Sequence, residues 1–306
     1  MDKDRQKILY FTVAYLNTVN RPPTTFEAWR FFIDLSGQKM NSSFSEVAAG
    51  LKNLCKNNKI LEKNGFWVLP SQKNNAGKRV AMQKLSISKI KRAAKWAKWL
   101  EMIPYCRGVV FTGALAFLNC RKKSDWDILV ITKEGRIWLG RLFVTFFLIL
   151  LGKKRTDKKN NDRFCLNHFM TKNNLIFPDR NEYSATGLSL MQPILGKEYF
   201  DKMQQINFAW YRTYLSNFSR DVVGNDQFSY KNNFLVKVRN FLEFILESSG
   251  IGDFLNQKCR YWMIKKIERN PKTYRKNAFI VYNDGELAFW PKPKRIENLK
   301  KVQGSF

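Results

Sequence analysis

Histidine and acidic residues are scarce in this chain of 306 residues. It contains one histidine, His168, and 25 Asp and Glu against 54 Lys and Arg. A single histidine argues against catalytic groups that pair it with a serine or cysteine nucleophile, and we expect it to be hydrogen-bonded within a strand. The formal net charge of +29 favours polyanionic partners: nucleic acid, nucleotides or an anionic membrane surface. A composition rich in Lys and Asn without functional meaning is the alternative explanation for part of this surplus.

Cysteine is also sparse, and its spacing excludes two classes of small stabilised domain. The five cysteines contain no C-x-x-C pair, so neither a disulfide framework nor a zinc knuckle fits. The charged N-terminal segment MDKDRQKILYF has no signal-peptide hydrophobic region, and we therefore expect a reducing, cytoplasmic location. The cysteines are Cys55, Cys106, Cys120, Cys165 and Cys259.

No apolar run is long enough to predict a stable membrane span. The most apolar segment, 137–151, reads IWLGRLFVTFFLILL and is interrupted by Arg141. Because a span needs about 20 apolar residues, we interpret this segment as a helix buried within the protein. A peripheral membrane anchor or scaffold role for this Phe-rich helix is the alternative.

The first 72 residues predict three short helices and a hairpin. An apolar helical pattern covers 8–20, and capping boxes with the spacing S/T-x-x-E begin at Thr24 and Ser43. Asn64-Gly65 lies between two apolar runs, which is a strong hairpin signal. This order of elements is that of a winged helix, a variant of the helix-turn-helix, in residues 1–72.

Basic side chains on the third helix and on the helix that follows suit a nucleic-acid backbone. We expect the polar segment 71–79 to be a linker and a helix to run over 80–102. Two alternatives remain open: a winged helix used for protein contact, and a solvated cationic face whose lysine stems lie along Trp96 and Trp99. The candidate nucleic-acid-binding residues are Lys52, Lys56, Lys91 and Lys95.

A glycine turn followed by two acids is the motif that carries chemistry. A β-branched run ends at Thr112-Gly113-Ala114, ten residues follow, and the chain then reads Asp125-Trp126-Asp127 before a second apolar run. Because side chains alternate along a strand, both acids are expected on one face. Close carboxylates repel unless a cation neutralises them, and their hard oxygens suit Mg²⁺ or Mn²⁺. The alternative to a metal site is that Asp125 and Asp127 belong to a solvated turn between strands.

This motif resembles the glycine-serine and D-x-D signature of the DNA polymerase β-type nucleotidyltransferases. The chain is most similar to bacterial and archaeal nucleotidyltransferase-domain proteins that carry an N-terminal winged helix, above all over 105–170. The resemblance implies an α+β fold with a mixed sheet and flanking helices. The expected domains are a winged helix over 1–72, a nucleotidyltransferase-like domain over 80–182 and a mostly helical C-terminal region over 183–306.

The resemblance also implies an activity: metal-dependent transfer of a nucleotidyl group from a nucleoside triphosphate to a hydroxyl acceptor. Asp125 and Asp127 would be the catalytic metal ligands for Mg²⁺ or Mn²⁺. The residues expected to hold the nucleotide are Thr112, Gly113, Ala114, Ser124 and Lys133.

Two departures from the family's pattern keep a second function open. Ala114 replaces the family's serine, which removes a hydroxyl donor to the phosphates. The third carboxylate is not evident either: the strand over 164–170 offers Asn167 as the third-ligand position, and no spacing selects another acid. The alternative is a catalytically degenerate fold acting as a DNA- or RNA-binding regulator.

The C-terminal region reads as mostly helical, and by resemblance it is expected to shape the acceptor pocket. A late hairpin is predicted around Asn283-Asp284-Gly285, followed by a charged helix over 295–301. The helices are expected near 184–193, 198–216, 230–248 and 252–268.

Overall fold

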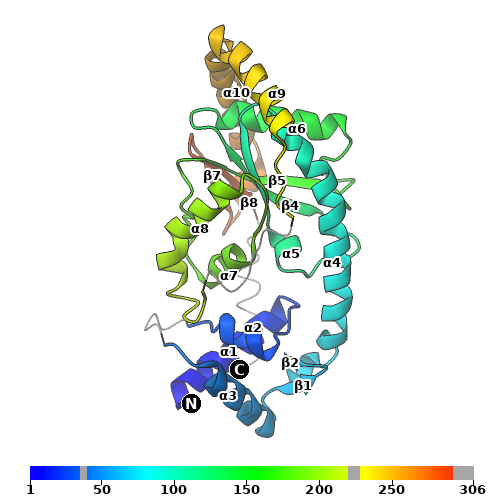
Figure 1. The fold of residues 1–306 in the computed structure, drawn as a ribbon, viewed down its shortest axis with the longest axis vertical. Helices are drawn as coiled ribbons and strands as arrows, with labels where there is room; N and C mark the ends of the chain where they lie inside the picture. Colours follow the sequence, from blue (N-terminus) through cyan, green and yellow to red (C-terminus); the bar gives the residue numbers. More distant parts are fainter. Residues whose placement is uncertain (35–39, 220–227, 292–306) are drawn as a thin grey trace.

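The structure, a computed structural model, describes residues 1–34, 40–219 and 228–291. Its elements confirm an α+β fold built around a mixed sheet. Figure 1 shows the sheet in the upper half, three short helices below it, and the long helix α4 (Asn75–Ala97) along one side. Two helices, α9 (Asn233–Ser248) and α10 (Ile251–Glu268), lie together at the upper end.

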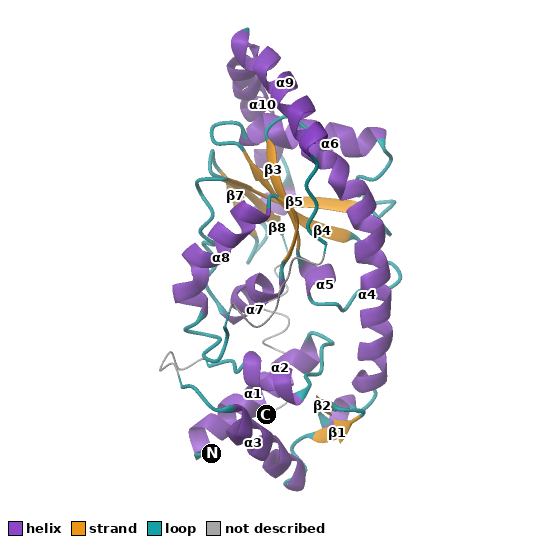
Figure 2. Ribbon diagram, in the orientation of Figure 1, coloured by secondary structure: helices purple, strands orange, loops and turns teal. Residues whose placement is uncertain are grey.

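The large sheet has six strands in the order β6-β3-β4-β5-β8-β7, and a separate hairpin pairs β1 with β2 (Figure 2). Only the central pair, β4 with β5, is parallel. The strands are β1 (Leu61–Lys63), β2 (Phe66–Val68), β3 (Cys106–Phe111), β4 (Trp126–Thr132), β5 (Phe164–Thr171), β6 (Gln192–Leu195), β7 (Phe279–Tyr282) and β8 (Glu286–Trp290).

Two hydrophobic cores cover the two faces of this sheet. Leu129 and Ile131 of β4 belong to the core shared with the N-terminal helices, whereas Ile128 and Val130 belong to the core shared with α4 and α6. This is the period-two alternation of a strand buried on both faces. The remaining α-helices are α1 (Lys3–Thr18), α2 (Thr25–Arg30), α3 (Phe44–Lys56), α5 (Gly113–Ala116), α6 (Ile137–Leu150), α7 (Glu182–Leu190) and α8 (Lys197–Tyr211), and 3₁₀ turns cover Pro70–Gln72, Lys98–Met102 and Pro271–Tyr274.

The local signals in the first 70 residues are confirmed. Thr24 and Ser43 each form a complete capping box at the start of α2 and α3. Asn64 and Gly65 have φ angles of 53° and 77° and form the turn between β1 and β2. Three helices and a hairpin therefore occur in the predicted order, although order alone does not identify a winged helix.

The predicted linker over 71–79 is wrong, because α4 begins within it at Asn75. Arg79 is buried, and its Nη2 donates to Glu27 Oε1 at 2.8 Å. Its guanidinium also lies over the Phe66 ring. These contacts reach back to α2 and to the hairpin, so they hold the segment in a helix that its polar composition does not indicate.

The C-terminal helices and the late hairpin are present, with one added strand. The helix expected to reach residue 193 ends at Leu190, because 192–195 forms β6 and pairs with β3. The predicted helix over 295–301 lies outside the described residues.

Segment 137–151 is helical, but only one side of it is buried. α6 buries Trp138, Val144 and Leu148, whereas Phe146 and Leu150 are 58% and 67% exposed. The prediction of a helix is therefore confirmed, whereas the prediction that the protein buries it on all sides is wrong. Among the described residues, no helix is both long enough and apolar enough to cross a bilayer.

Candidate metal and nucleotide site

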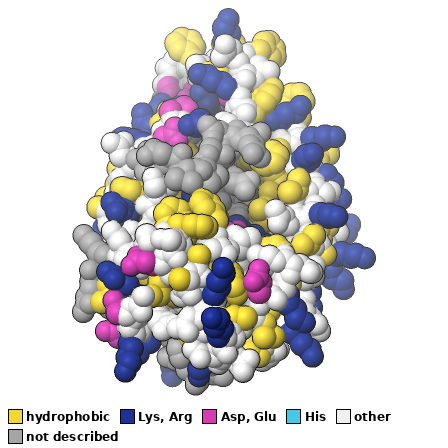
Figure 3. Space-filling view, turned by 60° about the horizontal axis from the view of Figure 1, so that its bottom comes forward, with side chains coloured by type: hydrophobic (Ala, Val, Ile, Leu, Met, Phe, Trp, Pro, Cys, Tyr) yellow, Lys and Arg dark blue, Asp and Glu magenta, His cyan; other side chains and the backbone are white. Residues whose placement is uncertain are grey.

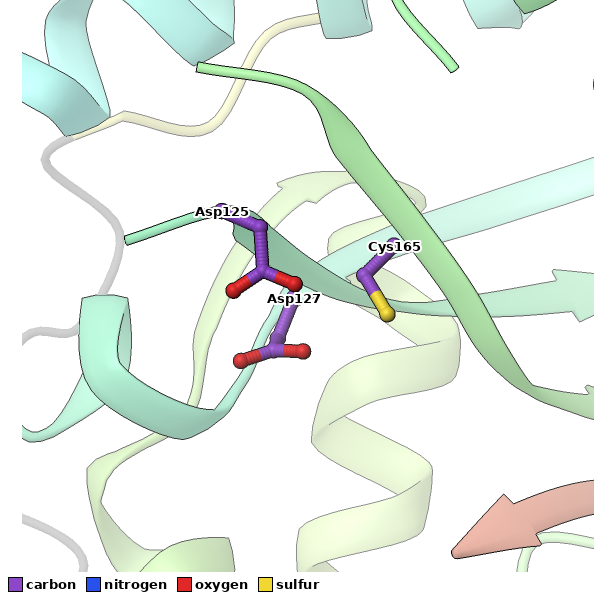
Figure 4. A group of neighbouring side chains, drawn as sticks. All are labelled: Asp125, Asp127 and Cys165. Carbon is purple, nitrogen blue, oxygen red and sulfur yellow. The ribbon is translucent and has the colours of Figure 1, made fainter. Parts of the chain in front are cut away.

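Asp125 and Asp127 point to the same side at the start of β4 (Figure 4). Each contributes a carboxylate oxygen to a group of three potential ligand atoms, completed by Cys165 Sγ, that lie within 4.8 Å of one another. The residue between them, Trp126, is buried on the other face against Phe164. The alternation along the strand thus produces the convergence that the D-x-D spacing predicts.

Gly113 is the turn residue that lies against Asp127. Its φ of +54° is in the left-handed region, and a Cβ built there would collide with the Asp127 carboxylate. The preceding Thr112 N–H donates to the Asp127 carbonyl at 3.0 Å. Glycine therefore satisfies two needs at once, an unusual backbone angle and the close approach of the turn to the second acid.

Cys165 on β5, and not the expected Asn167, completes the group with the two acids. In the parallel β4–β5 ladder it pairs with Asp127, and a register shift follows directly. Burial raises the pKa of the Cys165 thiol to about 12, and the charges of Asp127 and Asp125 add to this effect. The thiol is therefore neutral near pH 7. No sequence signal identifies this position, because it depends on the register between two strands separated by a helix and a loop.

Arg155 supplies a positive charge to the pair of acids. Its Nη1 donates to Asp125 Oδ2 at 2.6 Å and to Cys165 Sγ at 3.2 Å. Two carboxylates at this separation repel by about 3 kcal/mol at an effective dielectric constant near 20. Arg155 offsets part of this repulsion.

Lys89 fixes the backbone just before Asp125. It is 1% exposed, and its ammonium group donates to the Ser124 carbonyl at 2.9 Å and to Asp162 Oδ1 at 2.7 Å. It thereby ties the loop before β4 to the loop that contains Arg155. Lys89 is one of several lysines on the basic helix expected over 80–102, yet its side chain lies among the buried residues of α4. The signal in the sequence that could have identified Lys89 as buried is its place in a row of small and apolar residues at helical spacing. These residues are Ser86, Ile90, Ala93 and Ala97.

The two acids line a cleft of about 1250 Å³. Its wall also includes Thr112, Gly113, Asn167 and Tyr183. Burial, together with the charge of Asp127, raises the pKa of Tyr183 to about 12, so its hydroxyl stays protonated at neutral pH. The basic residues on the wall are Lys123, Arg141, Lys154, Arg155, Lys266, Lys272 and Arg275.

The remaining predicted nucleotide residues do not line this cleft. Ala114 follows Gly113 in α5 but is not part of the wall. Ser124 Oγ accepts from the Arg121 N–H, which closes the loop before β4. Lys133 follows the opposite end of β4 and binds Glu247 at 3.1 Å. Asn167 does line the cleft, two residues beyond Cys165 on β5.

The four lysines predicted to contact nucleic acid are all exposed. Lys52 and Lys56 lie on α3, and Lys91 and Lys95 lie on α4. None of them has an acidic partner within the described parts of the chain. Figure 3 shows Lys and Arg side chains scattered widely over one face of the molecule, with several along the edge where α4 runs and far fewer acids.

Comparison with known proteins identified no relative of this chain. No protein-family model matches the chain, and searches of curated proteins and of solved structures found no significant match.

Proposed function

We propose that this protein is a nucleotidyltransferase that uses a divalent cation to transfer a nucleotidyl group from a nucleoside triphosphate to a hydroxyl acceptor. One observation carries the proposal: Asp125 and Asp127 converge beside the Gly113 turn at the wall of a large cleft. The motif predicts the convergence of the two acids, and the cleft beside them is a further observation that supports the same function.

The distribution of charge in the cleft suits a metal–triphosphate complex. Two carboxylates attract a cation at one place, and basic side chains such as Lys154 and Lys266 occupy other parts of the wall. A triphosphate carries several negative charges, so it needs both the ion and the surrounding lysines and arginines. The volume exceeds that of an ordinary small-ligand pocket, which leaves room for an acceptor beside the nucleotide.

The donor set fits a hard divalent ion such as Mg²⁺ or Mn²⁺. Asp125 and Asp127 would hold it, and the protonated Cys165 thiol would contribute little to such an ion. The bound ion would supply charge neutralisation at the reacting phosphate and acidify the attacking hydroxyl. The chain's own contribution is to fix the two carboxylates through Gly113 and Lys89 and to hold the triphosphate with the basic wall.

The neutral Cys165 favours a second candidate function. Within the described residues, no third carboxylate joins Asp125 and Asp127 in this group, so the group itself supplies no separate general base. A protein that binds a metal–nucleotide complex and responds to it, without turnover, needs no such base. Such a protein would act as a nucleotide-dependent DNA- or RNA-binding regulator.

Label transfer distinguishes the two candidates. The purified chain is incubated with each α-labelled nucleoside triphosphate and Mg²⁺ or Mn²⁺, with and without total RNA. Asp125→Asn and Asp127→Asn should abolish labelling, whereas Asp157→Asn, which removes an exposed acid elsewhere in the cleft, should not. Metal-dependent nucleotide binding without labelling would support the regulator. Absence of both binding and labelling would exclude either use of the site.

We also propose that the basic faces of α3 and α4 bind nucleic acid. Each lost phosphate contact should lower the slope of log K against log salt by about 1. The double variant Lys52→Ala/Lys56→Ala should show this loss. Its control is Lys202→Ala/Lys276→Ala, which removes two exposed lysines from other parts of the chain. An unchanged slope in the first variant would favour a protein partner for the N-terminal helices.

A further inference from the structure

The helical hairpin of α9 and α10 lies at one end of the molecule (Figure 1). It carries many exposed apolar side chains. Thirteen of the twenty-two exposed large apolar side chains in the described ranges lie on α6, α9 and α10. Six of them flank the turn between α9 and α10 and are 38% to 68% exposed. We call these six the hairpin tip: Phe241, Leu242, Phe244, Ile245, Ile251 and Phe254.

α9 departs from the pattern of an ordinary surface helix, because its two acidic side chains pack against the protein while several apolar side chains are exposed. Glu243 is buried and accepts from Arg107 Nη2 at 2.6 Å, and Glu247 accepts from Arg136 Nη2 at 2.7 Å. A surface helix normally turns its apolar stripe inwards. Here the apolar stripe points outwards, which indicates a face that is covered by another surface when the protein acts. The stripe consists of Phe234, Phe241 and Ile245, at helical positions i, i+7 and i+11.

α10 adds lysines interleaved with aromatic rings on its exposed side. Lys258 Nζ lies 5.4 Å from the centroid of the Phe254 ring, and Lys265 Nζ lies 4.3 Å from that of Tyr261. Trp262, beside them, is 67% exposed. Rings with a polar edge and lysines with long apolar stems are the side chains that lie best at the boundary between hydrocarbon and lipid phosphate.

We propose that the hairpin tip inserts into the interface of an anionic lipid bilayer while Lys237, Lys258 and Lys265 contact the lipid phosphates. Residues 231–269 contain eight basic and four acidic residues. Three of the four acids, Glu243, Glu247 and Asp253, are already paired with arginines of the protein. The remaining charge of the hairpin is therefore positive, and it complements an anionic surface. This inference does not depend on the function proposed for the cleft.

Charge also argues against the two other occupants of this face. A second copy of the chain would bring two hairpins with the same positive charge together, in a protein of net charge +29. A nucleic acid would satisfy the lysines, but it offers no hydrocarbon to Leu242, Ile245 and Ile251. Of these three occupants, only a lipid interface offers hydrocarbon to the hairpin tip and negative charge to the lysines beside it.

Vesicle flotation of the full chain tests the proposal. The protein is mixed at physiological salt with vesicles of phosphatidylcholine alone, or of equal parts phosphatidylcholine and phosphatidylglycerol. We expect it to float with the anionic vesicles only. The variant Phe241→Ser/Phe244→Ser should lower the bound fraction by about tenfold or more, because two inserted rings lose their hydrocarbon contacts.

The matched control is Phe26→Ser/Phe44→Ser, which removes two exposed rings from α2 and α3, and it should float like the wild type. Circular dichroism establishes that each variant is folded. Unchanged flotation of the tip variant overturns the proposal, as does equal flotation with both lipids. A concentration-dependent dimer, or an RNA affinity that only the tip variant loses, would assign the face to those partners instead and would equally overturn it.

Discussion

Gly113 shows how much of the candidate site depends on one residue without a side chain. Its backbone angle and its contact with the Asp127 carboxylate both exclude other residues. Glycine is therefore required at position 113 by the contact with Asp127 as well as by the backbone angle of the turn.

Replacing Gly113 by alanine should disturb Asp127 as well as the fold. We expect a loss of about 1–3 kcal/mol in the free energy of unfolding and a loss of Mn²⁺ binding measured by calorimetry. Gly135→Ala is the control, since Gly135 has a similar φ of +69° and no atom lies within 4 Å of the position that an added methyl group would take. If both variants bind Mn²⁺ like the wild type, Gly113 does not position a metal ligand.

Arg155 should compete with a metal ion for Asp125. Its guanidinium bonds to Asp125 Oδ2, so the Arg155→Met variant removes this cation from the pair of carboxylates. We expect Mn²⁺ to bind this variant about tenfold more tightly, which corresponds to about 1.4 kcal/mol. Calorimetric titration at fixed ionic strength measures the change. Lys158→Met removes an exposed lysine from the same loop as a control, and weaker Mn²⁺ binding by Arg155→Met would contradict the competition.

The parts of the site that are local in the chain are the parts that can be predicted from the sequence. Asp125 and Asp127 share a face because strands alternate, and that rule needs no tertiary information. Cys165 and Arg155 reach the acids only after β5 pairs with β4 in a particular register. The expectation of a hydrogen-bonded strand histidine is confirmed, since His168 Nε2 lies 2.9 Å from Glu286 Oε1.

At the scale of elements, α9 is held to the sheet by ion pairs. Hydrogen bonds from Arg136, supported by Lys133 and opposed by partial burial, lower the pKa of Glu247 from 4.5 to about 2. A carboxyl whose pKa falls on folding stabilises the folded state above its unfolded pKa. That contribution is lost as the pH falls from about 4.5 towards 2.

Glu247→Gln should therefore destabilise the protein near pH 7 and have little effect near pH 2. Thermal unfolding of both proteins across this pH range, followed by circular dichroism, measures the difference. Glu268→Gln, at the far end of α10, provides an exposed acid as control and should show no such convergence. A difference in melting temperature that stays constant with pH would exclude the ionised Glu247 as its source.

Elements whose signals are local can be predicted well, and those that a distant partner decides cannot. Capping residues and the Asn64-Gly65 turn lie inside the elements that they define. The polar composition of 71–79 indicates a linker, yet Arg79 binds Glu27, a residue of another helix. The strand β6 likewise exists because β3 offers it an edge.

At the scale of the whole molecule, a buried ion cluster joins the N-terminal helices to α4, and a shared core joins them to the sheet. Glu27 Oε1 accepts from Arg21 Nη2 and Arg79 Nη2, each at 2.8 Å, and both arginine side chains are buried. The core that contains Leu9 and Leu51 continues into Leu129 of the sheet. Residues of the expected first domain therefore share their interior with the rest of the chain.

Removing the charge of Glu27 should weaken the whole fold. Glu27→Gln leaves two buried guanidinium groups without this counter-charge, which costs about 3 kcal/mol or more. Because the core is continuous, we expect denaturant unfolding followed by fluorescence and by circular dichroism to remain one transition at a lower midpoint. Glu46→Gln, at an exposed capping box, should lower the midpoint much less. Two separate transitions in Glu27→Gln, with only one displaced, would instead show that the N-terminal helices and the sheet unfold independently.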